Sequence, residues 1–247
     1  MVALILAAGY GTRLYPLAEK VPKALLPIQG RPILYYLIQK LERLNPAVGE
    51  GILVSNHRYV GEFRRWFAAV PGAIRWAILD DGSTSEKDRL GSMGDLAFAI
   101  RSRSLLEEDL LVVGSDNLFE DSLIGLLTFA MAKAPAVTLG SHELPDRALA
   151  SRYGVLTVDA NGKVTGFEEK PPHPQSSLIS TAVYFFPRGS QRWVLEYVGS
   201  ERTSDTLGAF IHWLIARAPV VAFPVRGRWF DIGDIASYNQ AEEAFHP

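Results

Sequence analysis

An apolar segment that leads straight into a glycine-rich turn constrains this chain more than any other feature of its sequence. Residues 2–6 read Val-Ala-Leu-Ile-Leu, a run typical of a buried strand. Gly9 and Gly11 follow, and together they allow a tight turn whose backbone N–H groups can face an anion. Arg13 and Lys23 then add two positive charges. The pattern predicts a polyphosphate site at the end of the first strand.

Two common phosphate-binding motifs do not describe this turn. The dinucleotide-binding fingerprint needs a third glycine where this chain has Leu14, which argues against an NAD-dependent dehydrogenase. The P-loop needs a Gly-Lys-Ser/Thr sequence that is also absent from the turn. The glycine pair alone would equally fit a solvated turn. It becomes restrictive only together with residues 22–27, which read Pro-Lys-Ala-Leu-Leu-Pro.

Composition narrows the classes of protein that this chain can belong to. A hydrophobic content of 48% and a charged content of 21% are ordinary for a globular enzyme, and 247 residues suffice for one large domain. The net charge of −2 gives no basic field for nucleic acid, and no apolar run reaches the length of about 18 residues that a membrane span needs. Without cysteine there is no disulfide or thiolate chemistry, and the N-terminus lacks the charged region of a signal peptide. We expect a cytoplasmic enzyme that binds neither nucleic acid nor membrane.

Strand-like and helical patterns alternate through the first 140 residues. Expected strands lie at 2–7, 51–55, 74–79, 109–113 and 136–140, and expected helices begin near 32 and cover 59–69, 94–103 and 121–133. This alternation predicts an α/β protein, a Rossmann-like three-layer α/β/α fold with a mostly parallel mixed sheet. Ligands of such sheets bind at the carboxyl ends of the strands.

The second half of the chain is richer in strands. Residues 153–158 and 163–168 alternate with period two around Asn161-Gly162, which predicts a hairpin. A third strand is expected at 179–186, with further elements at 189–198, 205–217 and 219–225 and a final helix from Asp234. His212 is interpreted as a packed residue of an apolar helix.

The segment from Leu6 to Leu14, with Pro16 and residues 22–27, resembles the signature of the sugar-1-phosphate nucleotidyltransferases, or nucleotide-sugar pyrophosphorylases. These include thymidylyl-, uridylyl- and cytidylyltransferases. The resemblance implies one domain over residues 1–247, with a nucleotide-binding half at 1–140 and a β-rich acceptor-binding half at 141–247. It implies transfer of NMP from an NTP to a sugar 1-phosphate with release of pyrophosphate, assisted by Mg²⁺. The sequence names neither base nor sugar, although the Leu-Ala-Ala-Gly form favours UTP or CTP.

Two aspartates follow strand-like runs and could hold that metal. Asp116 comes after the apolar residues 110–113, and Asp231 lies in the segment 229–233, Trp-Phe-Asp-Ile-Gly. Taken singly, each could equally be a turn former or a helix cap, although carboxylate oxygens suit Mg²⁺. The resemblance implies that both bind the metal, because the family uses an aspartate of a Gly-Asp-Asn and one of a Trp-x-Asp-x-Gly segment. Ser115 replaces the glycine of the first segment here.

The resemblance also implies the nucleotide contacts. Arg13 would bind the β- and γ-phosphates and Lys23 the α-phosphate, as the catalytic cations. The segment 82–95 contains glycine hinges and polar side chains and is expected to form a mobile flap over the nucleobase. The expected nucleotide-binding residues are Leu6, Ala7, Ala8, Gly9, Gly11, Thr12, Arg13, Lys23 and Gly91.

The acceptor contacts are expected in the second half of the chain. Residues 168–171 read Glu-Glu-Lys-Pro, which alone would suggest an exposed strand end. The resemblance implies that Glu169 binds sugar hydroxyls and Lys170 the sugar phosphate, with Gly154 letting the sugar approach the backbone. Thr181 completes the expected set, in a segment that departs from the family form because Ala182 stands where glycine is frequent.

Two other functions fit parts of the sequence. A cytidylyltransferase acting on a polyol or choline phosphate would share the glycine-turn chemistry and differ in its acceptor wall. A non-catalytic subunit that binds a nucleotide sugar would be expected to lack Lys23, Asp116 or Asp231, and all three are present. A homo-oligomer is compatible with the sequence.

Overall fold

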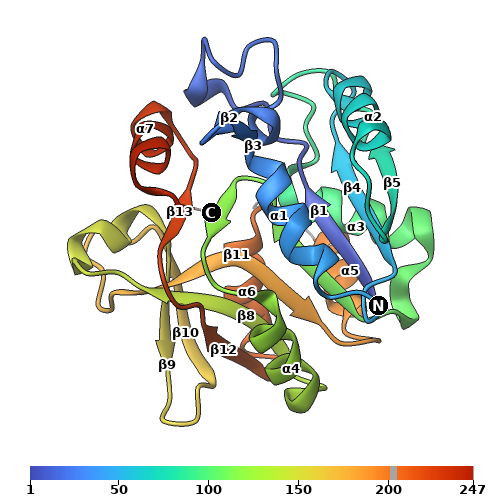
Figure 1. Ribbon diagram of the computed structural model, residues 1–247. Helices are drawn as coiled ribbons and strands as arrows, with labels where there is room; N and C mark the ends of the chain where they lie inside the picture. The colour runs from blue at the N-terminus through green and yellow to red at the C-terminus, as the bar shows by residue number, and fades with distance from the viewer. Residues whose placement is uncertain (201–204, 247) are drawn as a thin grey trace. The chain divides into compact units, whose positions relative to one another are not determined.

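The computed structural model describes residues 1–200 and 205–246 (Figure 1). Its contacts group into two compact units, each built from separate stretches of the chain. Unit 1 consists of Met1–Gly91, Val113–Ile124 and Gly227–Pro247, and unit 2 of Ser92–Val112 and Gly125–Arg226. The C-terminal stretch therefore belongs with the N-terminal one, whereas the expected functional halves divide at residue 140. That functional division stays a prediction.

Unit 1 contains a parallel sheet of three strands, in which β1 pairs with β4 and β4 with β5. Two small antiparallel pairs, β2 with β3 and β7 with β13, complete its strands. Its elements are β1 (Val2–Leu6), β2 (Pro27–Ile28), β3 (Arg31–Pro32), α1 (Ile33–Glu42), β4 (Glu50–Ser55), α2 (Val60–Ala69), β5 (Arg75–Asp80), β7 (Asn117–Phe119), β13 (Trp229–Asp231) and α7 (Ile235–Ala244).

The apolar runs of unit 1 form the elements that their patterns predict. Val2–Leu6 is an uninterrupted apolar run, and its first four residues are buried, as in a strand covered on both faces. In α1 the buried positions Ile33, Leu34, Leu37, Ile38 and Leu41 recur at helical spacing. Pro32 precedes this helix with a φ of −54°, so its ring suits the helix start and removes no helical hydrogen bond.

Unit 2 is mainly antiparallel. β9 pairs with β10, β11 pairs with both β8 and β9, and β12 runs parallel to β8. Three elements cross a boundary between the units, namely α3, β6 and α4. The elements are α3 (Gly91–Arg103), β6 (Leu110–Gly114), α4 (Leu123–Lys133), β8 (Val137–Glu143), β9 (Gly154–Val158), β10 (Val164–Glu169), β11 (Leu178–Phe186), α5 (Gln191–Gly199), α6 (Leu207–Leu214) and β12 (Val220–Pro224).

The predicted hairpin is confirmed as β9 and β10, drawn in yellow in Figure 1. Gly162 has a φ of +77°, a conformation that glycine adopts at little cost. The connection is longer than a two-residue turn, because the Asp159 carboxylate accepts hydrogen bonds from the backbone N–H groups of Asn161 and Lys163. A register shift between Val164 and Gly166 follows. The aspartate thus determines a wider loop than the Asn-Gly pair alone predicts.

The α/β class and the mixed sheet are confirmed. Each strand expected in the first 140 residues is present within a few residues of its predicted position. The short strands β2, β3 and β7 were not expected separately, because two or three residues carry no periodic pattern, whereas β13 confirms the short strand expected in the segment 229–233. Among the described residues, no helix combines the length and the apolar character that a membrane crossing requires.

We expect Gly51→Ala to destabilise the protein by about 1–3 kcal/mol, because it overpacks the β4–β5 pair. A Cβ at Gly51 would lie 2.5 Å from the Trp76 ring. That ring also contacts Phe67, with 5.0 Å between the ring centroids, so it has little freedom to move. Urea unfolding would measure the change. Gly49→Ala is the matched control, because no atom lies within 4 Å of its added Cβ. Equal losses in both variants would contradict the packing argument.

Candidate active-site residues

The glycine turn begins where β1 ends. Two hydrogen bonds with residues at the end of the neighbouring strand β4 fix the first residues of the turn. The N–H of Ala7 donates to the carbonyl of Val54 at 2.9 Å, and the Asn56 side-chain amide donates to the carbonyl of Ala8 at 2.8 Å. The two glycines then differ. Gly11 has a φ of +63°, so its conformation favours glycine. No atom lies within 4 Å of a Cβ placed on Gly9, which is exposed, so packing does not require glycine there.

Most of the predicted nucleotide-binding residues share this turn. Leu6 ends β1, and Ala7, Ala8, Gly9 and Gly11 follow it. Thr12 and Arg13 belong to a short 3₁₀ helix, Thr12–Leu14, in which both are exposed. Lys23 begins a second 3₁₀ helix, Lys23–Leu25. Their contacts with a nucleotide remain predictions, and they all lie in unit 1.

Asp116 lies between β6 and β7 and pairs with Lys23. The Lys23 ammonium donates to Asp116 Oδ2 at 2.6 Å, and the Asn117 amide nitrogen donates to Asp116 Oδ1 at 2.9 Å. Burial raises the pKa of the Asp116 carboxyl, but the charge and hydrogen bond of Lys23 outweigh it, so the pKa lies below its usual value. Asp116 is therefore a carboxylate near neutral pH, with both of its oxygens occupied by donors.

Strand β13 brings Asp231 to the same place. In the antiparallel β7–β13 pair Asp231 is the partner of Asn117, and the N–H of Ile232 donates to the Asp116 carbonyl at 3.0 Å. Asp231 Oδ2 and the Arg13 guanidinium each lie 3.7 Å from the position of a Cβ on Gly233. Unit 1 thus gathers Arg13, Lys23, Asp116 and Asp231, which are far apart in the sequence.

The donor set suits a divalent cation that is shared with a substrate. Among residues 1–200 and 205–246, no three His, Cys, Asp or Glu side chains form a group that could hold a metal. Mg²⁺ is commonly held by one or two carboxylates together with phosphate oxygens and water. Asp116 and Asp231 could supply such carboxylates, and the ammonium beside Asp116 shows that this position already attracts a cation.

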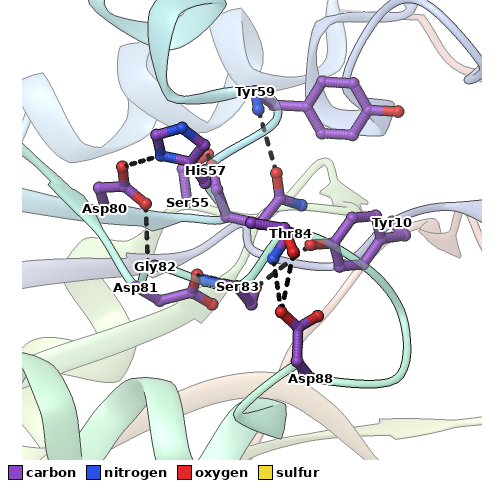
Figure 2. A network of polar contacts seen from close by, with 11 residues as sticks. Tyr10, Ser55, His57, Tyr59, Asp80, Asp81, Gly82, Ser83, Thr84 and Asp88 are labelled. Carbon is purple, nitrogen blue, oxygen red and sulfur yellow. Dashed lines mark hydrogen bonds and ion pairs between the residues drawn. The ribbon is translucent and has the colours of Figure 1, made fainter.

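The predicted flap is anchored at its base, as Figure 2 shows. Backbone hydrogen bonds join Asp81 to Ser55 and His57 to Ser83, each at 2.9 Å. Buried Ser83 donates to the Asp81 carboxylate at 2.8 Å and lies 3.3 Å from the Tyr10 hydroxyl of the glycine turn. Because a carboxylate only accepts, the tyrosine donates to Ser83. This contact links the segment to the glycine turn, which the composition of the segment did not indicate.

The tip of the same segment folds onto itself. The Asp88 carboxylate accepts from the backbone and hydroxyl groups of both Thr84 and Ser85, and these bonds hold its pKa well below the usual value. Gly82 and Gly91 have positive φ values of 80° and 72°. Helix α3 begins at Gly91, and Met93 and Asp95 are buried in it, so residues 91–95 of the predicted flap are a helix start and not a loop. Closure over a nucleobase and the contact of Gly91 with nucleotide remain predictions.

His57 was not singled out by the sequence. Its Nδ1 lies 2.7 Å from Asp80 Oδ2, at the ends of the neighbouring strands β4 and β5 (Figure 2). Burial raises the pKa of Asp80, but hydrogen bonds from His57 and Gly82 outweigh it and keep the pKa low. No motif signals this pair, because it depends on the register of two strands.

The expected acceptor residues Glu169 and Lys170 lie at the end of β10 in unit 2. Lys170 has a φ of +46°, which is uncommon outside glycine, and its N–H donates to the Tyr153 carbonyl at 3.0 Å. Its ammonium lies 3.8 Å from Glu169 Oε1, and both side chains are exposed. Strained backbone of this kind is frequent at ligand sites.

The structure places Gly154 and Thr181 in packed surroundings. A Cβ on Gly154 would come within 3.0 Å of the Phe167 ring and nearer still to its tip, so packing alone explains this glycine. Thr181 is fully buried, and its hydroxyl faces the Cα of Gly140. The predicted acceptor contacts of both residues stay predictions.

A pocket of about 570 Å³ adjoins Glu169 in unit 2, and Pro172, His212 and Trp213 also line it. The interpretation of His212 as a packed residue is wrong, because its side chain is exposed. Its Nδ1 lies 2.8 Å from the Phe167 carbonyl, which can only accept, so Nδ1 carries the proton. Nε2 is then the imidazole nitrogen left for a ligand. The apolar residues around position 212 favoured a packed interpretation, because the sequence does not indicate toward which side of the helix His212 points.

Comparison with known proteins places this chain in a family. Residues 2–246 match the family model described as nucleotidyl transferase, and the chain belongs to that family. It is 29% identical over 249 residues to a UTP–glucose-1-phosphate uridylyltransferase of Synechocystis, covering 98% of this chain and 62% of that protein. It is 30% identical over 257 residues to a glucose-1-phosphate adenylyltransferase of Thermosipho africanus, covering 96% and 60%. The chain thus spans about three fifths of the length of these two relatives.

The fold is also that of a solved protein. A crystal structure from Bacillus anthracis, described as a candidate glucose-1-phosphate thymidylyltransferase in complex with a sucrose, superimposes with a TM-score of 0.79 at 20% sequence identity. The likeness covers 98% of this chain and 94% of that one. The α/β architecture is therefore shared over nearly the whole chain.

We expect Lys23→Met to lower the free energy of unfolding by about 1–3 kcal/mol at neutral pH, because it leaves the Asp116 carboxylate without its partner. The lowered pKa of Asp116 contributes stability above the usual pKa of an aspartate, and that contribution is lost as pH falls through the lowered value. In the variant the hydrogen bond from Asn117 remains but the charge of Lys23 is gone, so the pKa of Asp116 lies higher than in the wild-type protein. The two proteins should therefore converge in stability on acidification.

Denaturant unfolding from about pH 7 to about pH 2, a range that extends below the usual aspartate pKa of about 3.9, would measure this convergence. Lys20→Met is the matched control, because Lys20 is an exposed lysine of the same loop. A difference between Lys23→Met and the wild-type protein that does not change with pH would show that the loss is not electrostatic.

Proposed function

We propose that this protein transfers a nucleoside monophosphate from an NTP to a sugar 1-phosphate, giving an NDP-sugar and pyrophosphate. The observation that carries the proposal is the gathering of Arg13, Lys23, Asp116 and Asp231 in unit 1, the unit that also contains the open glycine turn. Two cations and two carboxylates suit a triphosphate and its metal. The family and the uridylyl-, adenylyl- and thymidylyltransferase names among its relatives support the same reaction class.

The proposed reaction needs positioned charge more than a general base. An oxygen of the acceptor phosphate forms a bond to the α-phosphorus of the NTP, and the bond from that phosphorus to the oxygen bridging to the β-phosphate breaks. The attacking monoester is largely dianionic near neutral pH, because its second pKa is about 6. Its oxygen is therefore already a nucleophile. The protein has to hold two anions in line and neutralise the departing pyrophosphate.

Each charged side chain has a proposed part in that task. Arg13 binds the β- and γ-phosphates, so that its charge stabilises the pyrophosphate as it leaves. Lys23 binds the α-phosphate, and Lys170 binds the phosphate of the acceptor, while Glu169 accepts hydrogen bonds from sugar hydroxyls. When bound, Mg²⁺ held by Asp116 and Asp231 supplies further positive charge to the triphosphate.

Glycine at position 9 supports the proposed nucleotide contact. Neither a positive φ nor a neighbouring atom requires glycine there, whereas Gly11 needs its conformation. A ligand that approaches the backbone would explain the missing side chain. Residues 6–12 would then contact the nucleotide, and the Leu-Ala-Ala-Gly form still favours UTP or CTP.

The acceptor is assigned to unit 2. The exposed residues Glu169 and Lys170 stand at the strained end of β10, and the pocket beside them has the volume range of small-molecule sites. His212 lines that pocket, and we add it to the proposed sugar contacts. Its Nε2 is suited to accept a hydrogen bond from a hydroxyl when the ring is neutral.

A screen of pyrophosphate release tests the function. ATP, GTP, CTP, UTP and dTTP are each combined with sugar 1-phosphates and, separately, with alditol and choline phosphates, with and without Mg²⁺. We expect turnover with a sugar 1-phosphate and a pyrimidine nucleotide that depends on the metal. Turnover with a polyol or choline phosphate alone would favour the cytidylyltransferase alternative. Nucleotide-sugar binding without turnover of any pair would favour the non-catalytic one.

The KM values for the two substrates should be raised by different substitutions. We expect Lys170→Ala to raise KM for the acceptor and Arg13→Ala to raise KM for the NTP, each roughly 10- to 100-fold, because each removes a charge-assisted hydrogen bond. Initial rates with one substrate varied and the other saturating would measure both. Arg89→Ala, in the exposed tip of the predicted flap (82–95), is a comparison variant that separates phosphate binding from effects of that segment. If Lys170→Ala raised KM for the NTP alone, the acceptor assignment would be wrong.

A further inference from the structure

The two oxygens of the Asp116 carboxylate have different kinds of partner. Oδ1 accepts from the Asn117 amide at 2.9 Å, and Asn117 Oδ1 accepts from the Trp229 indole N–H at 2.8 Å. An indole nitrogen can only donate, so it fixes which end of the Asn117 side chain faces Asp116. Trp229 and Asn117 belong to the paired strands β13 and β7. Asp116 Oδ1 is therefore held by a short-range network of neutral groups on two strands.

The other oxygen is held by a single flexible chain. Asp116 Oδ2 accepts from the Lys23 ammonium at 2.6 Å, and the side chains are 17% and 28% exposed for Lys23 and Asp116. A lysine carries its charge on a four-carbon stem with many rotamers, so it can leave this contact while its backbone stays in place. Solvent reaches the pair, so the position is open to exchange. Of the two oxygens, Oδ2 has the mobile partner, whereas the partner of Oδ1 is held on a strand.

We propose that Lys23 is the counter-ion of Asp116 in the metal-free protein, and that a divalent cation replaces it at Oδ2 and so releases Lys23 for the nucleotide phosphate. The proposal rests on the metal assignment made above for Asp116. It adds that one lysine has two positions, one on the carboxylate and one on the substrate. Trp229 and Asn117 are positioning residues, since they keep Oδ1 occupied during the exchange.

Electrostatics makes the exchange compulsory. An ammonium and a divalent cation that both lay against one carboxylate oxygen would repel each other strongly at a partly buried site. Without nucleotide, a cation therefore has to displace Lys23 into a position where no phosphate receives it. With nucleotide, the released ammonium gains a new anionic partner. Binding of metal and of nucleotide should consequently reinforce each other through Lys23.

Binding of Mn²⁺ alone to the full chain tests the exchange, with free Mn²⁺ measured by electron paramagnetic resonance at about pH 8, where the Asp116 carboxyl is ionised. We expect Lys23→Met to bind Mn²⁺ about tenfold more tightly than the wild-type protein, because the competing charge is gone. Lys23→Arg keeps the charge and should stay near the wild type. Lys20→Met controls for the general loss of one positive charge, and circular dichroism checks the fold of each variant.

The outcomes separate this proposal from the proposed function. Lys23→Gln repeats the experiment if the methionine variant does not fold. The exchange would be overturned if the uncharged variant that folds, Lys23→Met or Lys23→Gln, bound Mn²⁺ with unchanged or weaker affinity. The metal assignment would stay intact in that case if Asp116→Asn lost binding. If Asp116→Asn bound Mn²⁺ like the wild-type protein in the presence of NTP, the metal assignment itself would fail.

Discussion

The ion pair between Lys23 and Asp116 is the contact around which the charged residues of the proposed site in unit 1 are arranged. It joins the segment that follows the glycine turn to the loop between β6 and β7, which lie far apart in the sequence. The same loop meets β1, since the Ser115 N–H donates to the Leu6 carbonyl at 3.1 Å. A partly buried pair of this kind contributes modestly to stability, but it fixes where two charges of the proposed site stand.

Pairing of β13 with β7 adds the C-terminal part of the chain to this arrangement. Three residues on each strand suffice to bring Asp231 beside Asn117 and Trp229 within hydrogen-bond distance of it. The side chains of Asp231 and Arg13 then both lie beside Gly233. Such short strands would be unstable alone, and the buried cluster of Leu14, Ile28, Leu118, Phe230 and Ile232 supports them. Packing of apolar side chains therefore positions the charged ones.

The sequence predicted the parts of this structure that depend on local order. The apolar run 2–6 gave a strand, the Asn161-Gly162 pair a hairpin, and the spacing of Gly9, Gly11, Arg13 and Lys23 a charged turn. Contacts between residues that are distant in the sequence could not be predicted from local patterns. The Phe167 ring over Gly154 and the hydrogen bond of His212 to Phe167 arise from the packing of β10 with its neighbours, and the burial of Thr181 arises from the pairing of β11 with β8. A motif identifies a candidate residue, but tertiary contacts determine whether its side chain is accessible to a ligand.

Gly9 and Gly154 show how such contacts change the meaning of a residue type. Both were interpreted as glycines that let a ligand approach the backbone. At Gly154 a protein side chain occupies the space of the missing Cβ, so the interior accounts for the glycine. At Gly9 the space is open and the backbone unstrained, so neither packing nor conformation accounts for it. Of the two positions, Gly9 therefore gives the stronger support to a ligand, and that ligand would lie in the unit that holds Lys23 and Asp116.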